Sequence, residues 1–233
     1  MKRLFLLLSV AALLGAAGVA SAQTIGIGAG YVNSVNRTVP DGATLNTVGF
    51  DGFYLGVTYG LPIGNGLSLE PGFQYEFLTK SRNILPLVKE NDTDHYIDIP
   101  VHLNYSLPVN EMMKFFVTAG PTFAIGLASQ SKFSALGYSA VYDNYLGEVD
   151  ADFLGSGIME YIAQLSPYVS EYFNRGNGYS RFDVLLGIGA GIDLSEIFRF
   201  KVGYDWGLLN RYSNDTGATR HRNRLTVGVA YLF

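Results

Sequence analysis

Several features are scarce or missing in this chain of 233 residues, and each excludes a class of protein. It has no cysteine, so a secreted domain of this size must be stabilised by something other than disulfides. Charged residues make up 15% of the chain, the net charge is −4, and no basic run occurs, which argues against a nucleic-acid partner. Beyond residue 22, no apolar run is long enough for a transmembrane helix.

The N-terminus has the pattern of a secretory signal peptide. Lys2 and Arg3 precede an apolar run that ends in Ala20-Ser21-Ala22, a small-x-small cleavage site. A membrane anchor is the alternative, but the run is short and ends in a cleavage pattern. We therefore predict a signal peptide over residues 1–22 and one mature domain over residues 23–233.

The mature chain is dominated by alternation of apolar and polar residues, which indicates β-strands. In each segment, large apolar residues occupy every second position, and all fourteen glycines inside the segments occupy the positions between them. These two sets of positions, which face opposite sides of a strand, are here called the two parities. The alternating segments are 24–33, 53–61, 67–80, 95–107, 114–128, 181–194, 199–210 and 222–233.

A soluble β-sandwich would also alternate, with its apolar face inward. Three features favour a membrane barrel instead: aromatic residues lie near the segment ends, the segments are long enough for a tilted membrane crossing, and short and long connections alternate. Backbone N–H groups cannot stay unpaired in lipid, so the sheet must close. We predict an all-β fold, an eight-stranded antiparallel transmembrane up-and-down β-barrel.

The connections also predict the topology. Short turns contain PIGNG, PVNEMM and SEIFR, whereas the other connections are long. Short turns face the periplasm and long loops face outward in bacterial outer membrane barrels. The predicted extracellular loops are 34–52, 81–94, 129–180 and 211–221.

The inward parity carries charges that an eight-stranded barrel, which has room only for side chains, must bury. Buried charges need partners. We predict an interior polar network, with Asp205 and Arg224 as the favoured ion pair; an ion or proton path is the alternative. The network comprises Glu70, Glu76, Asp98, His102, Asp183, Lys201, Asp205 and Arg224, with Asp193 also inward and Arg222 as a further candidate.

The chain ends in alternating large residues, of which Tyr231 and Phe233 are the last two. A terminal aromatic after such alternation is similar to the signal by which bacterial barrel-assembly machinery recognises its clients. We expect that machinery as a partner, together with outer membrane lipid and lipopolysaccharide. The predicted location is the bacterial outer membrane.

No catalytic, cofactor or metal site is predicted. The three histidines, His95, His102 and His221, spell out no triad arrangement. Four acids near residues 143–152 lack the spacing of an EF-hand, so we expect a solvated acidic loop. GIGAG occurs twice, but its glycine spacing is wrong for a nucleotide-binding loop and no helix pattern follows.

The longest predicted loop, 129–180, is rich in tyrosine and has a helix-like stretch at 157–173. Loops of this length are commonly functional, and tyrosine suits contact with sugars or proteins. We therefore expect a non-enzymatic protein whose outer loops serve adhesion, contact with an extracellular ligand or protein partner, or assembly in the envelope. The alternatives are a narrow pore and a lipid-acting enzyme.

Two segments carry a more specific pattern. HYIDIPVHLNYSLP at 95–108 and KFFVTAGPTFAIGL at 114–127 resemble the PorT-like outer membrane β-barrel family of Bacteroidota. The resemblance implies an eight-stranded outer membrane barrel and transfers no catalytic residue. It implies little about activity, because only the founding member of the family is tied to secretion and gliding. The matching residues are Tyr96, Asp98, Ile99, Pro100 and Tyr105, then Ala119, Gly120 and Pro121.

Overall fold

The computed structural model describes residues 24–39, 46–86, 88–135, 137–151, 157, 178–212 and 219–233. The predicted signal peptide, residues 1–22, lies outside the described residues. Within them the chain forms ten β-strands, and no helix has the length and apolar character needed to span a membrane. The strands are β1 (Thr24–Val39), β2 (Asn46–Gly64), β3 (Leu67–Leu85), β4 (Val88–Asn110), β5 (Met113–Ala135), β6 (Tyr138–Asp143), β7 (Glu148–Ala151), β8 (Phe182–Leu194), β9 (Phe198–Gly207) and β10 (Thr219–Leu232).

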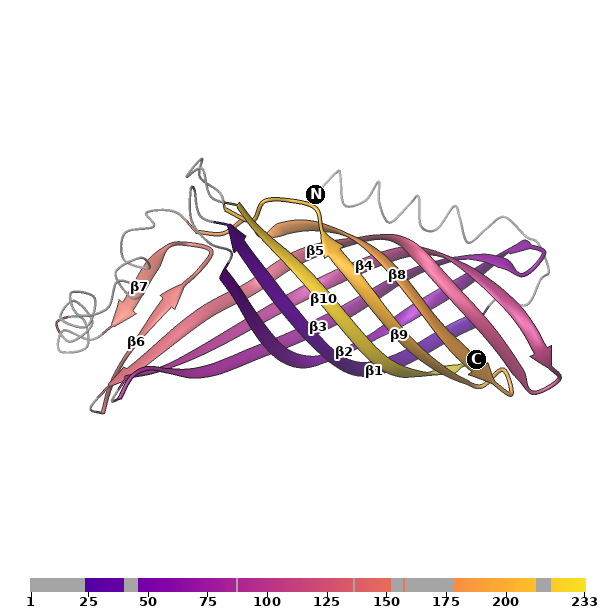
Figure 1. The fold of residues 1–233 in the computed structure, drawn as a ribbon, viewed down its shortest axis with the longest axis horizontal. Coiled ribbons are helices and arrows are strands. Elements are labelled where there is room, and N and C mark those ends of the chain that lie inside the picture. The colour runs from indigo at the N-terminus through magenta and orange to yellow at the C-terminus, as the bar shows by residue number, and fades with distance from the viewer. Residues whose placement is uncertain are drawn as a thin grey trace.

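Eight of these strands form a closed antiparallel ring. Their order is β1, β2, β3, β4, β5, β8, β9, β10, and β10 pairs with β1 to complete it. The pairing of β4 with β5 joins the two halves of the sheet. β6 and β7 lie outside the ring and extend the sheet from the far end of β5 (Figure 1).

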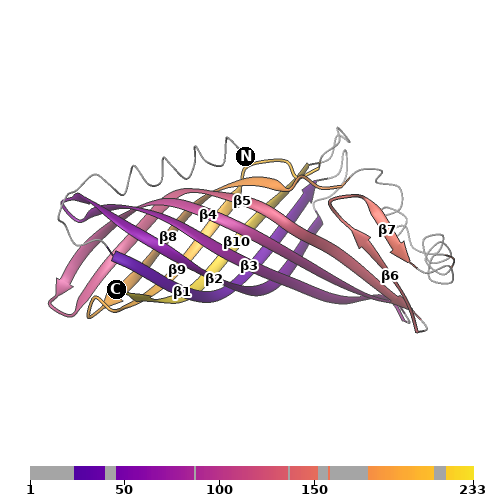
Figure 2. The same ribbon diagram turned by 180° about the vertical axis from the view of Figure 1, so that it is seen from behind.

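Three short turns of the ring lie at one end, here called the short-turn end (Figures 1 and 2). The opposite end is called the long-loop end, although only residues 86–87 separate β3 from β4 there. The turns join β2 to β3, β4 to β5 and β8 to β9, as the sequence predicts. Asn65 and Gly66 have φ angles of 52° and 78°, the paired positive values of a tight hairpin turn that an Asn-Gly sequence favours. Phe233 also lies at the short-turn end, where its backbone N–H donates to the carbonyl of Ile25 at 2.8 Å.

Six of the eight ring strands, β1 to β5 and β10, are longer than predicted, and the loops between them are correspondingly shorter. β4 and β5 have 23 residues each, about 75 Å of extended chain, against a lipid-facing band of about 25 Å. The loop predictions at 34–52 and 81–94 are therefore wrong in extent, since most of those residues continue β1 to β4. β10 likewise begins at Thr219, inside the predicted loop 211–221.

The predicted loop 129–180 begins as strand. Residues 129–135 complete β5, and the chain then returns as the hairpin of β6 and β7. The helix-like stretch 157–173 lies outside the described residues apart from residue 157. The loop bounds were predicted wrongly because the alternation of large apolar residues stops where the strands leave the apolar band, whereas backbone pairing continues.

The two faces of the ring differ as the alternation predicts. Outward side chains are large, apolar and exposed, such as Leu103, Phe200 and Val229, at 48%, 45% and 44% exposure. Inward side chains are mostly polar, charged or glycine, and several are fully buried. An exposed apolar belt around a polar interior is the inverse of a soluble protein and suits a lipid environment.

Candidate functional site: the charged interior and the long-loop end

The middle of the ring is filled by an ionic cluster, defined as Glu76, Asp98, Asp205, Arg222 and Arg224. Each of these side chains is at most 5% exposed. They come from β3, β4, β9 and β10, so the cluster bridges opposite walls of the ring. Alternation places each of them on the inward face of its strand.

Arg224 lies at the centre of the ionic cluster. Its Nε donates to Asp205 Oδ2 at 2.9 Å, and its Nη1 donates to Glu76 Oε2 at 2.7 Å. Nη1 also contacts the carboxylate of Asp98. The structure therefore pairs Arg224 with Asp205, which is directly opposite it in the β9–β10 register, and adds two further carboxylates to the pair.

Arg222 adds a second guanidinium, two residues from Arg224 along β10 on the side of the long-loop end. Its Nη1 donates to Glu76 Oε1 at 3.1 Å, and its Nη2 lies 3.6 Å from Asp98 Oδ1. Asp183 of β8 is at the edge of this contact, with 3.9 Å between Asp183 Oδ2 and Arg222 Nε. The Arg222 guanidinium also stacks over the ring of Tyr96, 3.9 Å from the centroid. A desolvated cation over an aromatic face is stabilised by the ring quadrupole.

A second group of charges lies nearer the short-turn end. Arg199 binds Asp193 through two hydrogen bonds of 2.7 and 2.8 Å and donates a third to Glu70 at 2.7 Å. Asn104 donates to the same carboxylate oxygen of Glu70 at 2.7 Å. Arg199 was missed by the sequence reasoning because it begins its predicted segment, although it shares the inward parity of Lys201.

Between these two groups lies a polar cavity of about 40 Å³. Lys201 Nζ is 3.5 Å from His102 Nδ1, and His102 Nε2 is 3.2 Å from the hydroxyl of Thr122. Both Lys201 and His102 line this cavity, which has room for a few water molecules. A wider mouth of about 490 Å³, partly lined by Glu70 and Arg199, opens at the short-turn end.

The outer half of the interior is closed by an apolar cluster that the sequence did not predict. Val32, Phe50, Leu78 and Tyr96 are each at most 4% exposed and point inward from four strands. Phe50 lies in a segment that was predicted to be a loop. The other three lie at inward positions of predicted strands, where the neighbouring inward residues are mostly polar or glycine. Together with the ionic cluster, these residues obstruct the interior between the cavity and the long-loop end.

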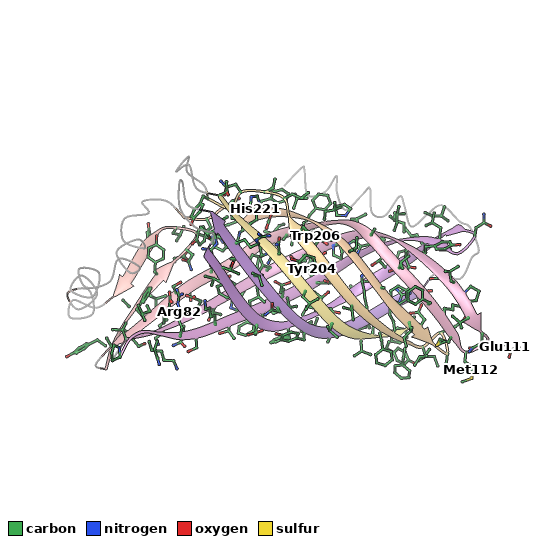
Figure 3. All side chains as sticks on the ribbon, in the orientation of Figure 1. Arg82, Glu111, Met112, Tyr204, Trp206 and His221 are labelled. Atoms are coloured by element: carbon green, nitrogen blue, oxygen red, sulfur yellow. The ribbon has the colours of Figure 1, made fainter. Side chains whose placement is uncertain are left out.

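Charged residues also line the inside of the long-loop end, beyond the apolar belt. Arg82 pairs with Glu90, and Ser129 donates to Asp94 at 2.5 Å. Figure 3 shows Arg82 at this end and Glu111 and Met112 at the other. Burial, and next the Glu90 carboxylate, raise the pKa of Asp92 to about 7. These residues were missed because 81–94 was predicted to be a loop.

The three histidines point in different directions. His102 is inward on β4, and His95 lies on the outer face of the same strand, where its Nδ1 is 2.5 Å from the hydroxyl of Tyr75. His221 belongs to β10, near the long-loop end (Figure 3). Within the described residues, no group of three or more His, Asp or Glu side chains is arranged to hold a metal ion. Asp143, from the predicted acidic loop, accepts hydrogen bonds from the backbone N–H groups of Tyr145 and Leu146.

Aromatic side chains mark both borders of the apolar belt. At the short-turn end, Tyr231 packs edge-on against Phe233 and Phe198, with centroid separations of 4.7 and 5.7 Å. Toward the long-loop end, Phe53 packs against Phe77 with 5.4 Å between ring centroids, and the next outward residues, Asp51 and Thr79, are polar. Such aromatic girdles are typical of membrane–water interfaces.

A closed ring with a polar interior, an apolar belt and aromatic borders is the architecture of one protein class, and comparison with known families names it. Residues 21–213 match the family described as "Outer membrane protein beta-barrel domain". The chain belongs to this family. It is therefore an outer membrane protein, and the predicted location is confirmed.

Two solved structures of outer membrane proteins are similar to this chain. Ail, the attachment invasion locus protein of Yersinia pestis, shares 16% identity over 91% of this chain and 100% of its own, with a TM-score of 0.42. OprG from Pseudomonas aeruginosa shares 11% identity over 91% of this chain and 96% of its own, with a TM-score of 0.43. None of the curated proteins matches the chain.

Proposed function

We propose that this outer membrane protein is a non-enzymatic binding protein whose ligand or partner contacts the long-loop end. In this proposal the short-turn end faces the periplasm and the long-loop end faces the outside. The observation that carries the proposal is the contrast between a blocked interior and a projecting end. The ionic cluster fills the middle of the ring, whereas β3 to β7 extend well beyond the apolar belt.

The blocked interior weighs against the first alternative, a narrow pore. Glu76, Asp98 and Arg222 are fully buried, and Arg222 forms ion pairs with both carboxylates across the ring, so an ion would have to break several charge-assisted contacts to pass. The mouth of about 490 Å³ lies at the short-turn end, and within the described residues the ionic cluster and the apolar cluster lie between the cavity beside Lys201 and the long-loop end. We propose that this arrangement stabilises the barrel and does not conduct.

Within its family, we place the protein in the PorT-like group on the two motif segments. Tyr96 and Asp98 of that motif both contact Arg222, which gives the motif a structural role in the interior. We also propose that Tyr231 and Phe233 form the C-terminal signal read by the barrel-assembly machinery. Both are exposed at the short-turn end, at 43% and 67%, where periplasmic machinery would meet them.

The test replaces residues 137–178 with a short Gly-Ser linker, which removes β6 and β7 and leaves the ring strands whole. Full-length and shortened proteins in nanodiscs are then applied to arrays of glycans and extracellular-matrix proteins. Binding by the full chain that the shortened protein lacks supports the proposal. Equal binding by both, steady conductance in a planar bilayer, or turnover of labelled lipopolysaccharide would each contradict it.

A further inference from the structure

The outward side chains of β3, β4 and β5 change character beyond the apolar belt. Along β4 the outward residues run from Ile97 through His95, Thr93 and Asn91 to Lys89. The side chains of 79–83 and 130–134 follow the same trend on the neighbouring strands. We name the outward side chains of residues 79–83, 89–93 and 130–134 the polar outer face.

The three strands are in register across this face. Ser81 lies opposite Asn91, which lies opposite Lys132; in the next row, Asn83 lies opposite Lys89, which lies opposite Ser134. The face therefore consists of hydroxyl, amide and ammonium groups. Lys89 and Lys132 are diagonal neighbours, about 7 Å apart, and neither makes an ion pair within the described residues.

Acidic residues of the same strands point the other way. Glu90, Asp92 and Asp94 alternate with the outward residues and are buried on the inner side. The nearest outward carboxylate is Asp143 of β6, which lies opposite Gln130 and diagonal to Lys132, and its Oδ1 accepts hydrogen bonds from two backbone N–H groups of its own turn. The polar outer face thus has a net charge of +2 with no carboxylate of its own.

The position of the polar outer face relative to the membrane indicates which ligand it would meet. The polar outer face continues the lipid-facing side of the same strands, and its rows rise to about 15 Å above the apolar belt once strand tilt is included. In the proposed orientation, that layer holds the phosphorylated sugars of lipopolysaccharide. Lysine ammonium groups bind phosphate as point charges, and hydroxyl and amide side chains hydrogen-bond sugar hydroxyls.

We infer that the polar outer face binds the phosphorylated saccharide of lipopolysaccharide, with Lys89 and Lys132 as the phosphate contacts. The inference rests on the orientation proposed above, but it does not depend on a ligand at β6, β7 or the loop after them. It assigns the lipid-side surface of the projecting strands to the membrane's own glycolipid.

The test measures binding of purified lipopolysaccharide to the folded full-length protein in detergent. The Lys89→Gln/Lys132→Gln variant should bind roughly tenfold to thirtyfold more weakly, since each lysine near an anionic surface is worth about one factor of five. The difference should shrink as salt rises. Both substitutions are at outward, polar positions. If the variant is folded, its unheated and heated samples should differ in gel mobility as those of the natural chain do.

Lys114→Gln is the matched control, because Lys114 lies at the short-turn end and pairs with Glu196. It should bind lipopolysaccharide like the natural chain, and enzymatically dephosphorylated lipopolysaccharide should bind all proteins alike. Equal binding by the double variant and the natural chain, or equal weakening by Lys114→Gln, would overturn the inference. Binding in detergent is independent of orientation, so an inverted topology in cells would be detected separately by labelling a cysteine placed at position 81.

Discussion

Arg224 contacts carboxylates from three different strands: Asp205 of β9, Glu76 of β3 and Asp98 of β4. At the scale of single residues, the interior is a network in which each charge depends on several partners. Removing one partner from a buried ionic group costs more than the pair contributed, because the remaining charge is left desolvated.

Replacing Arg224 with Gln should therefore lower the free energy of unfolding by about 3–5 kcal/mol. Urea unfolding in detergent, followed by gel mobility, measures the change. Asp205→Asn should cost less, because Arg224 keeps Glu76 and Asp98. The double variant should lose less than the sum of the two single variants; strictly additive losses would remove the Asp205–Arg224 pair from the account.

Asp92 predicts a pH dependence at the long-loop end, outside the membrane-spanning part of β4. Its pKa of about 7 in the folded protein exceeds the ordinary value of 3.8, because burial and then Glu90 disfavour the carboxylate. Between these values the folded protein holds more protons than the unfolded chain, so the free energy of unfolding falls as pH rises from about 4 to 7.

Asp92→Asn should remove this fall and stabilise the protein at pH 8 by about 2 kcal/mol. Unfolding curves of both proteins at pH 5 and pH 8 give the comparison. The variant should match the natural chain more closely at pH 5 than at pH 8. A constant difference across this range would show that the Asp92 carboxylate does not titrate there.

At the scale of strands, glycine lets adjacent strands and inward side chains approach closely. A Cβ added at Gly52 would lie 1.8 Å from the carbonyl oxygen of Phe77 on the neighbouring strand β3. A Cβ at Gly60, also inward on β2, would meet its nearest atom at 3.4 Å. The first position has no room for a methyl group unless the β2–β3 ladder moves, and the second has room.

Gly52→Ala should consequently destabilise the barrel by about 1–3 kcal/mol, whereas Gly60→Ala should change its stability little. The midpoint of thermal unfolding in detergent distinguishes the two. Similar midpoints for both variants would mean that β2 and β3 are farther apart near Gly52 than the structure places them.

The sequence predicted where strands exist better than where they end. Alternation located all eight ring strands, because lipid on one side and polar groups on the other impose a strict period of two. It stopped short at residues 81–94, since the outward residues Lys89, Asn91 and Thr93 lie beyond the apolar belt and, being polar, no longer contrast with their inward neighbours. Backbone pairing, which extends these strands, leaves no trace in hydrophobicity.

The interior was also predicted only in part. Parity alone placed Asp205, Arg224, Glu76 and Asp98 inward, and register explains the Asp205–Arg224 pair. Contacts across the ring, such as Arg224 with Glu76, join residues 148 positions apart, and their geometry depends on ring closure and strand tilt. Position in the alternating pattern could not supply that geometry.

Considered as a whole, the ring should pass through three environments: the outside of the cell at the long-loop end, hydrocarbon around the belt and the periplasm at the short-turn end. The absence of cysteine in the natural chain makes each environment accessible to a single engineered thiol. Ser81 is outward at the long-loop end, Val57 lies in the belt and Glu111 lies in a short turn.

The most direct measurement is labelling of Ser81→Cys, Val57→Cys and Glu111→Cys in intact cells with a membrane-impermeant maleimide. We predict that position 81 reacts at once, that position 111 reacts only after the outer membrane is permeabilised, and that position 57 reacts in neither state until the protein is denatured. Prompt labelling of position 57 in the folded protein, or of position 111 in intact cells, would contradict this prediction.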